Sequence, residues 1–224
     1  MSSMSDVDWT EWEVQAHPTE ELFERLRCVT LAGDPGVRIY AEADICLTTV
    51  RPQRLAAAQY YVLRPVLERM RALRWHLEAK GLNLLQLEGY LTLTHSRTGE
   101  VVDLLPPIVE WSEEANGEVF DLINDGVHRC YLAYLEHRKV QVAYVEGVPA
   151  EFPFYAYPIP GDCWAKMKVR SEITPDVLKR WRRIADKKAL YRNFDSAFRG
   201  VSGRRKEDKQ RHYKGFREHV REGV

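Results

Sequence analysis

The residues with the clearest potential for chemistry lie in one short stretch, 123–129, which reads Ile-Asn-Asp-Gly-Val-His-Arg. This pattern predicts the end of a strand, a turn and the start of a helix. The first turn of a helix holds roughly half a positive charge from unpaired amides, so Arg129 and a protonated His128 would be repelled there. A bound phosphate would remove this conflict, because it accepts backbone N–H bonds and pairs with a guanidinium, while Gly126 lets it approach the main chain closely. The stretch therefore predicts a phosphate-binding turn.

The same residues also have an explanation that needs no ligand. Asp-Gly is a frequent turn dipeptide, and Asp125 has the side chain of a helix cap. Arg129 and His128 would then turn back to acids such as Asp121 or Glu118, or point into water. The sequence leaves both interpretations open.

A longer run around this turn resembles the ParB/sulfiredoxin superfamily. It extends from Pro107-Ile108-Val109 through Asp125-Gly126-Val127-His128-Arg129, called the box below, to Val140-Gln141-Val142. The resemblance covers about 45–145 and implies a mixed α/β core of the α+β class. It also implies that the box binds nucleotide phosphates, which places this role on Gly126, His128 and Arg129, and on Asp125 beside them.

Differences between this chain and the patterns of the superfamily narrow the range of activities that the resemblance implies. Sulfiredoxins have their reactive cysteine directly before the His-Arg pair, where this chain has Val127, and Cys130 is expected to be buried on the apolar face of the helix. Partition proteins, which hydrolyse CTP, follow the core with a helix-turn-helix domain for which this chain has too few predicted helices. The free-serine kinases have the most similar box. The resemblance therefore implies a Mg²⁺-dependent phosphotransferase or nucleoside-triphosphate hydrolase that acts on a small molecule, with ATP or CTP as the nucleotide.

Phosphoryl transfer also needs a carboxylate for the metal and a base for the acceptor hydroxyl. Asp125 is the candidate for both a catalytic role and the Mg²⁺ contact, and Glu110, at the end of a predicted strand, is the candidate base. Arg51 and Arg54 lie where members of the superfamily often have another phosphate contact. Glu110 is equally explained as a solvated strand-end carboxylate, and the two arginines as surface cations at a helix start.

Hydrophobic periodicity predicts the elements that would position these residues. We expect helices from Thr19, over 54–80 with a bend or division at Pro65, over 127–137, and from Thr174 to Ala185. Extended segments are expected at 37–50, 87–93, 108–111, 119–123 and 140–145, and a ring-packed loop at 152–161. We divide the chain into an N-terminal extension (1–36), a nucleotide-binding domain (37–165) and a basic helical C-terminal region (166–224).

The charge is unevenly distributed along the chain. The 33 Lys and Arg residues balance the 33 Asp and Glu residues overall, yet 166–224 has 19 of the former against 8 of the latter. This surplus, which includes Arg204, Arg205 and Lys206, predicts an alternative function in which the C-terminal region binds DNA or RNA. The other interpretation is that this region packs against the acidic body.

The remaining composition excludes several classes of protein. No run of eighteen apolar residues or secretion signal is present, so we expect a cytoplasmic protein without a membrane partner. The four cysteines and seven histidines show no zinc-ligand spacing, and no Walker loop occurs. The oligomeric state is not predicted by any of these features.

Overall fold

The structure is a computed structural model, and it describes residues 7–173, 179–182 and 189–201. Helices and strands are mixed along the chain, which confirms the α+β class. The helices are η1 (Trp9–Glu11), α1 (Thr19–Leu26), η2 (Pro52–Arg54), α2 (Arg64–Glu78), α3 (Val127–Leu135) and η3 (Phe194–Ser196). The strands are β1 (Trp12–His17), β2 (Thr30–Leu31), β3 (Asp44–Val50), β4 (Leu55–Ala56), β5 (Tyr61–Leu63), β6 (Tyr90–His95), β7 (Val101–Leu104), β8 (Ile108–Glu113), β9 (Val119–Asp125), β10 (Val140–Glu146), β11 (Lys168–Arg170) and β12 (Arg192–Asn193).

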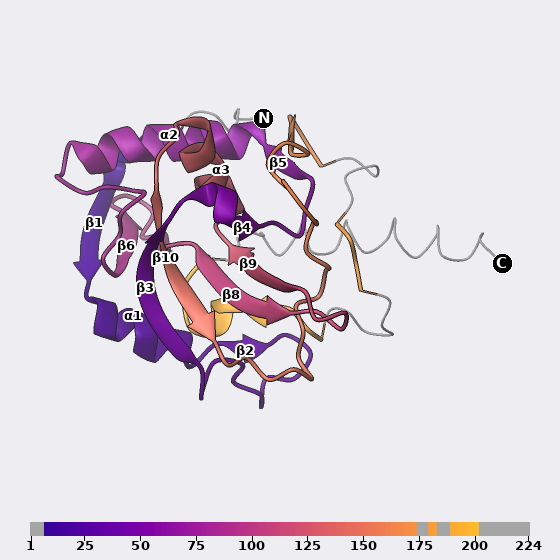
Figure 1. The fold of residues 1–224 in the computed structure, drawn as a ribbon. Helices are drawn as coiled ribbons and strands as arrows, with labels where there is room; N and C mark the ends of the chain where they lie inside the picture. Colours follow the sequence, from indigo (N-terminus) through magenta and orange to yellow (C-terminus); the bar gives the residue numbers. More distant parts are fainter. Residues whose placement is uncertain (1–6, 174–178, 183–188, 202–224) are drawn as a thin grey trace, which may run out of the picture.

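The central element is a five-stranded sheet with the order β3-β10-β8-β9-β4 (Figure 1). β8 and β9 are antiparallel neighbours, and α3 connects β9 to β10, which returns parallel to β8. The strands expected near 108–111, 119–123 and 140–145 and the helix expected from 127 are therefore confirmed. The turn that contains the box lies between β9 and α3.

Each face of this sheet is covered by a separate apolar cluster. α3 and the first turns of α2 cover one face, where Leu67 and Tyr131 pack with Val109 and Ile123. On the opposite face, α1 and the segment after residue 190 pack on the sheet through residues that include Leu22, Leu26, Phe194 and Phe198. Residues from the C-terminal quarter thus complete the core of the sheet. The separate C-terminal region from residue 166 stays a prediction.

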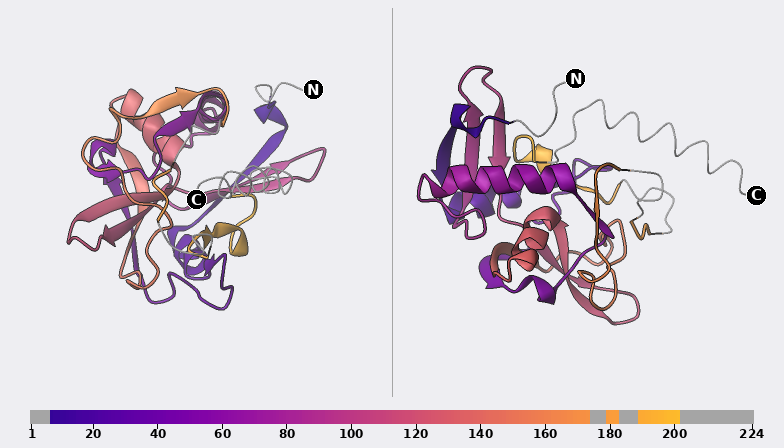
Figure 2. Two further views of the ribbon diagram at one scale, coloured as in Figure 1. Left: turned by 90° about the vertical axis from the view of Figure 1, so that its right-hand side faces the viewer. Right: turned by 90° about the horizontal axis from the view of Figure 1, so that it is seen from above.

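A second sheet, β1-β6-β7, lies beside the first, and α2 runs between it and α3 (Figure 2). Leu73 and Leu77 of α2 are buried against Leu91 and Leu93 of β6. α2 therefore has apolar contacts on two sides, which fixes the position of its first turn relative to α3.

The division predicted at Pro65 within 54–80 is confirmed, with Pro65 near the start of the second part, but the helix predicted before it is wrong. α2 begins at Arg64, and Pro65 lies in its first turn, where the missing N–H of proline has no cost. The preceding residues form η2 and the two short strands β4 and β5. Their alanines 56–58 are buried in the core, so the apolar spacing there comes from a buried extended segment. β7 was not predicted.

The helix predicted from Thr174 to Ala185 is also wrong where the structure describes it. Residues 179–182 are extended, and isolated bridges pair Lys179 with Gln59 and Trp181 with Ala156. The rest of this predicted helix and the cations Arg204, Arg205 and Lys206 lie outside the described residues.

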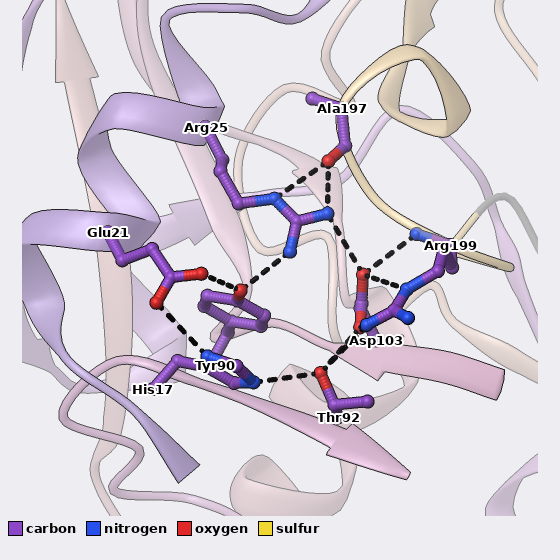
Figure 3. Close-up of polar contacts among 8 residues, drawn as sticks. All are labelled: His17, Glu21, Arg25, Tyr90, Thr92, Asp103, Ala197 and Arg199. Carbon is purple, nitrogen blue, oxygen red and sulfur yellow. Dashed lines mark hydrogen bonds and ion pairs between the residues drawn. The ribbon is translucent and has the colours of Figure 1, made fainter. Parts of the chain in front are cut away.

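The C-terminal segment is bound to the body by a polar network (Figure 3). Arg25 donates to the carbonyl of Ala197, and Arg199 forms a two-oxygen ion pair with buried Asp103. Arg182 and Arg192 pair in the same way with Glu114 and Glu110. These three C-terminal cations therefore fit the interpretation that this region packs against the acidic body.

Among the helices that the structure describes, none is both long enough and apolar enough to cross a membrane.

Candidate functional site

The turn of the box has a backbone that requires glycine. Gly126 has a φ of 85° and is the N-cap of α3. A Cβ atom at this position would lie 2.8 Å from both Cα and Cβ of Pro107, closer than packed atoms approach each other. A side chain here would therefore be strained twice, by the left-handed backbone and by the contact with Pro107.

Arg129 is buried beside the turn with incomplete hydrogen bonding. The residue is only 5% exposed, and Nη2 lies 3.3 Å from Oδ2 of Asp125. Nη1 is buried and has no hydrogen-bond partner among the residues that the structure describes. Asp125 does not cap the helix, and Arg129 turns to Asp125 instead of to Asp121 or Glu118.

The charges of this pair are affected by their surroundings. Burial raises the pKa of Asp125, and the nearby Arg129 only partly offsets this increase. Burial likewise lowers the pKa of Arg129. About 30% of the Asp125 side chain remains exposed, so this carboxylate is accessible from solvent while the guanidinium behind it is not.

His128 is neutral at pH 7, so it adds no positive charge to the first turn of α3. Its Nε2 atom accepts a hydrogen bond of 3.0 Å from the backbone N–H of Leu63. Burial, together with the positive charges of Arg69 and Arg129, lowers the pKa of His128 to about 4. His128 therefore acts as an acceptor for the protein's own backbone at neutral pH.

The same hydrogen bond connects the first turns of two helices. Leu63 is the N-cap of α2, a helix of 15 residues, and His128 belongs to the first turn of α3, a helix of 9 residues. The partial positive charges of both helix starts therefore point into one region. Arg69 of α2 adds a guanidinium whose Nε is buried and has no partner in the described part of the chain. No sequence signal distinguishes Arg69, because it is one of several arginines in the first three turns of α2.

Glu110 is not free to act as a base, contrary to the prediction. It is 2% exposed, its two oxygens each accept a 2.8 Å hydrogen bond from Arg192, and Oε1 also accepts from the hydroxyl of Tyr40 at 2.5 Å. A carboxylate held in this way is part of the core.

Arg51 and Arg54 lie towards the other end of α3. Trp164 donates to the carbonyl of Pro52 between them and stacks on Tyr134, in the last turns of the helix. Arg54 is exposed beside a shallow hollow of about 320 Å³ at the β4–β9 edge. The hollow is lined by Gln53, Arg54, Leu55, Ala56, Val119, Phe120, Asp121 and Gly161. The structure therefore does not bring these two arginines to the box.

The metal-binding capacity of the box is limited to one carboxylate. In the described ranges, no three His, Cys, Asp or Glu side chains gather as a metal cage. Mg²⁺ is commonly held by one or two carboxylates together with substrate phosphates, so Asp125 fits a metal that arrives with a nucleotide. Cys130 is fully buried, as expected, and burial raises the pKa of its thiol to about 12, so it is inert.

Comparison with known families agrees with the resemblance found in the sequence. The family model described as ParB CE domain matches residues 21–168, about two thirds of the chain. The chain belongs to the ParB CE domain family. This match confirms a ParB-like domain, while the similarity of the box to that of the free-serine kinases stays a prediction. No curated protein and no solved structure matches the chain. The matched span of the ParB CE domain includes the box, α2 and Glu110, but it ends before Arg192.

Proposed function

We propose that this ParB-like protein binds a nucleoside triphosphate, ATP or CTP, with its phosphates against the box. The main support is the state of Arg129, a buried guanidinium with an unpartnered Nη1 beside a helix start. An unmade hydrogen bond at a buried charged group costs about 1–3 kcal/mol or more. A phosphate oxygen at the turn would accept this hydrogen bond, so bound ligand would remove the cost.

The surroundings of Arg129 favour an anion with several charges. The first-turn amides of α2 and α3 point into the same region, and Arg69 adds a second guanidinium. Asp125 is the carboxylate that partly compensates them through its contact with Arg129. A triphosphate supplies the negative charge that this arrangement lacks.

His128 contributes a hydrogen-bond donor rather than a charge. Since Nε2 accepts from Leu63 and the ring is neutral, the ring proton is on Nδ1. We propose that this N–H donates to a phosphate oxygen, and that Asp125 contacts Mg²⁺ bound to the nucleotide. The chemistry that Mg²⁺ would supply is neutralisation of phosphate charge.

Binding is the step that these residues support. Transfer of the terminal phosphate to a small molecule, or its hydrolysis, additionally needs a base, and the paired Glu110 does not supply one. Asp125, with its partly exposed side chain and raised pKa, is the remaining candidate for that role at the turn.

A thermal-shift experiment with ATP, CTP and GTP, each with Mg²⁺, tests this proposal. A ligand at one hundred times its Kd should add about 2.7 kcal/mol and raise Tm by about 5–10 °C for a chain of this size. The variant Arg129→Met should lose this shift. The matched control is Arg97→Met, because Arg97 is 74% exposed on the hairpin between β6 and β7 and should leave the shift intact.

The alternative, binding of DNA or RNA through the C-terminal region, makes the opposite prediction. Its support is the surplus of cations after residue 166, of which Arg204, Arg205 and Lys206 are the candidates. Should no nucleotide raise Tm, while affinity for a short duplex falls steeply with salt on a log–log plot, the nucleotide proposal is wrong and the alternative holds.

A further inference from the structure

A buried chain of hydrogen bonds extends from the C-terminal segment to the residue that precedes the box. Arg192 donates to both oxygens of Glu110, and Glu110 accepts from the hydroxyl of Tyr40. The same hydroxyl accepts a hydrogen bond of 3.1 Å from Nδ2 of Asn124. Tyr40 is fully buried, so this connection is shielded from water.

Asn124 lies at an irregularity of the sheet directly before the turn. Val109 pairs with Ile123 and Ile108 pairs with Asp125, so Asn124 is the extra, bulged residue of β9. A bulge changes the direction of a strand and so determines where the next residues point. The amide Oδ1 of Asn124 is buried and has no partner in the described part of the chain. The side chain is therefore held through the hydrogen bond that its Nδ2 donates to Tyr40.

Arg192, at the other end of this hydrogen-bond network, lies outside the span that matches the ParB CE domain. Residues 21–168 contain Tyr40, Glu110 and Asn124, but Arg192 follows 24 residues after the match ends. Arg192 holds Glu110 in place with two hydrogen bonds and is itself fixed by the carbonyls of Phe152, Pro153 and Leu190. The acceptor of Tyr40 is thus positioned by a residue of the C-terminal segment.

We infer that Tyr40 is a positioning residue for the box. Through Asn124, Tyr40 fixes the bulge that orients Asp125 and Gly126. Tyr40 is in turn held by Glu110, which Arg192 of the C-terminal segment keeps in place. This inference rests on the proposed function for its effect on nucleotide binding, whereas its effect on the order of the turn does not depend on any ligand.

The first experiment measures the turn without a ligand. The amides of Arg129 and Cys130 bond the carbonyl of Gly126 and close the first turn of α3. In Tyr40→Phe their hydrogen exchange, followed by NMR, should become about tenfold faster, because loss of one hydrogen bond changes a local equilibrium by this order. The amide of Ala143, bonded to Pro107 at 2.9 Å, should exchange as in the wild type.

The matched control is Tyr144→Phe, which removes the hydroxyl of a tyrosine on β10. Tyr144 donates to Oδ1 of Asp121 at 2.6 Å, and this bond does not lead to Asn124. The control should leave the exchange of Arg129 and Cys130 unchanged. If Tyr40→Phe also leaves it unchanged, or accelerates Ala143 equally, the inference is wrong and Tyr40 has only a general role in stability.

A double-mutant cycle on nucleotide binding tests the route through Asn124. Tyr40→Phe and Asn124→Ala should each raise the Kd of magnesium ATP or magnesium CTP about tenfold, and the double variant should be no weaker than Asn124→Ala alone. Additive losses would contradict this route. If the wild type binds neither nucleotide while the exchange data are as expected, the proposed function fails and the positioning role stands.

Discussion

Two arginines of this protein are buried to nearly the same extent, and their surroundings differ completely. Arg192 is 6% exposed, and each of its three guanidinium nitrogens donates to an acceptor, among them both oxygens of Glu110. Arg129 is 5% exposed, makes one contact of 3.3 Å with Asp125 and has a buried Nη1 without a partner in the described residues.

This difference indicates that Arg192 is a structural cation and that Arg129 is a candidate for binding a ligand. Burial of a charge is tolerated when its partners satisfy every donor, as at Arg192. A charge that is buried without this compensation reduces stability, and it persists in a site where a ligand supplies what is missing. The ion pair at Glu110 is therefore part of the core, whereas the ion pair at the box leaves a buried donor uncompensated.

The largest expected effect is on stability at Arg192. Arg192→Met leaves Glu110 buried without its cation, and we expect it to lower the free energy of unfolding by about 3–5 kcal/mol. Arg129→Met is the matched control and should cost about 1 kcal/mol, because it also removes an unpaired buried donor. Urea unfolding measures both. Equal losses in the two variants would mean that the two buried guanidinium groups are compensated to the same extent.

The next effect concerns the backbone beside Arg129. Gly126→Ala should lower the free energy of unfolding by about 2–3 kcal/mol, since it adds left-handed strain and a contact with Pro107. Gly117→Ala is the matched control, because Gly117 has a φ of 80° with nothing within 4 Å of the added atom. It should cost only about 1 kcal/mol. The same loss in both variants would mean that the turn tolerates a side chain.

The last effect appears only as the pH falls below neutral. It is a pH dependence of the free energy of unfolding, and it arises at His128 and not at Arg192. The pKa of His128 is about 4 in the folded state against an ordinary value of 6.5, so the unfolded chain binds more protons between these two values. Stability from His128 is fully present above about pH 7 and declines as the pH falls towards 4, by about 3 kcal/mol. Denaturant unfolding as a function of pH measures this decline.

His128→Gln provides the comparison, because its Oε1 still accepts from Leu63 but does not titrate in this range. Asp125, whose raised pKa acts with the opposite sign at acidic pH, is present in both proteins, so their difference isolates the imidazole. A difference that is independent of pH between 7 and 4 would show that His128 is not buried as the structure describes.

The helix and strands around the box were predicted well from the sequence, because their signals are local. Runs of β-branched and aromatic residues bounded by turn residues identified β8, β9 and β10, and the Asp-Gly turn before Val127 identified the start of α3. The helix predicted before Arg64 was wrong because buried alanines in an extended segment have no distinctive period.

The roles of the side chains were harder to predict, because they depend on contacts between distant residues. By its place at the end of a strand, Glu110 is a candidate base, but Arg192, 82 residues later, donates hydrogen bonds to both of its oxygens. The charge of His128 depends on the N–H of Leu63, 65 residues earlier, and on burial. Neither partner has a spacing or composition that identifies it in advance.

The distance in sequence between Glu110 and Arg192 also bears on how a nascent chain matures. A ribosome completes the whole span 21–168 before Arg192 is synthesised. Until then the Glu110 carboxylate must remain hydrated or protonated, because burying it alone costs several kcal/mol. The centre of the sheet can therefore reach its final packing only after residues 190–193 dock, and this long-range closure should be the slow step of folding.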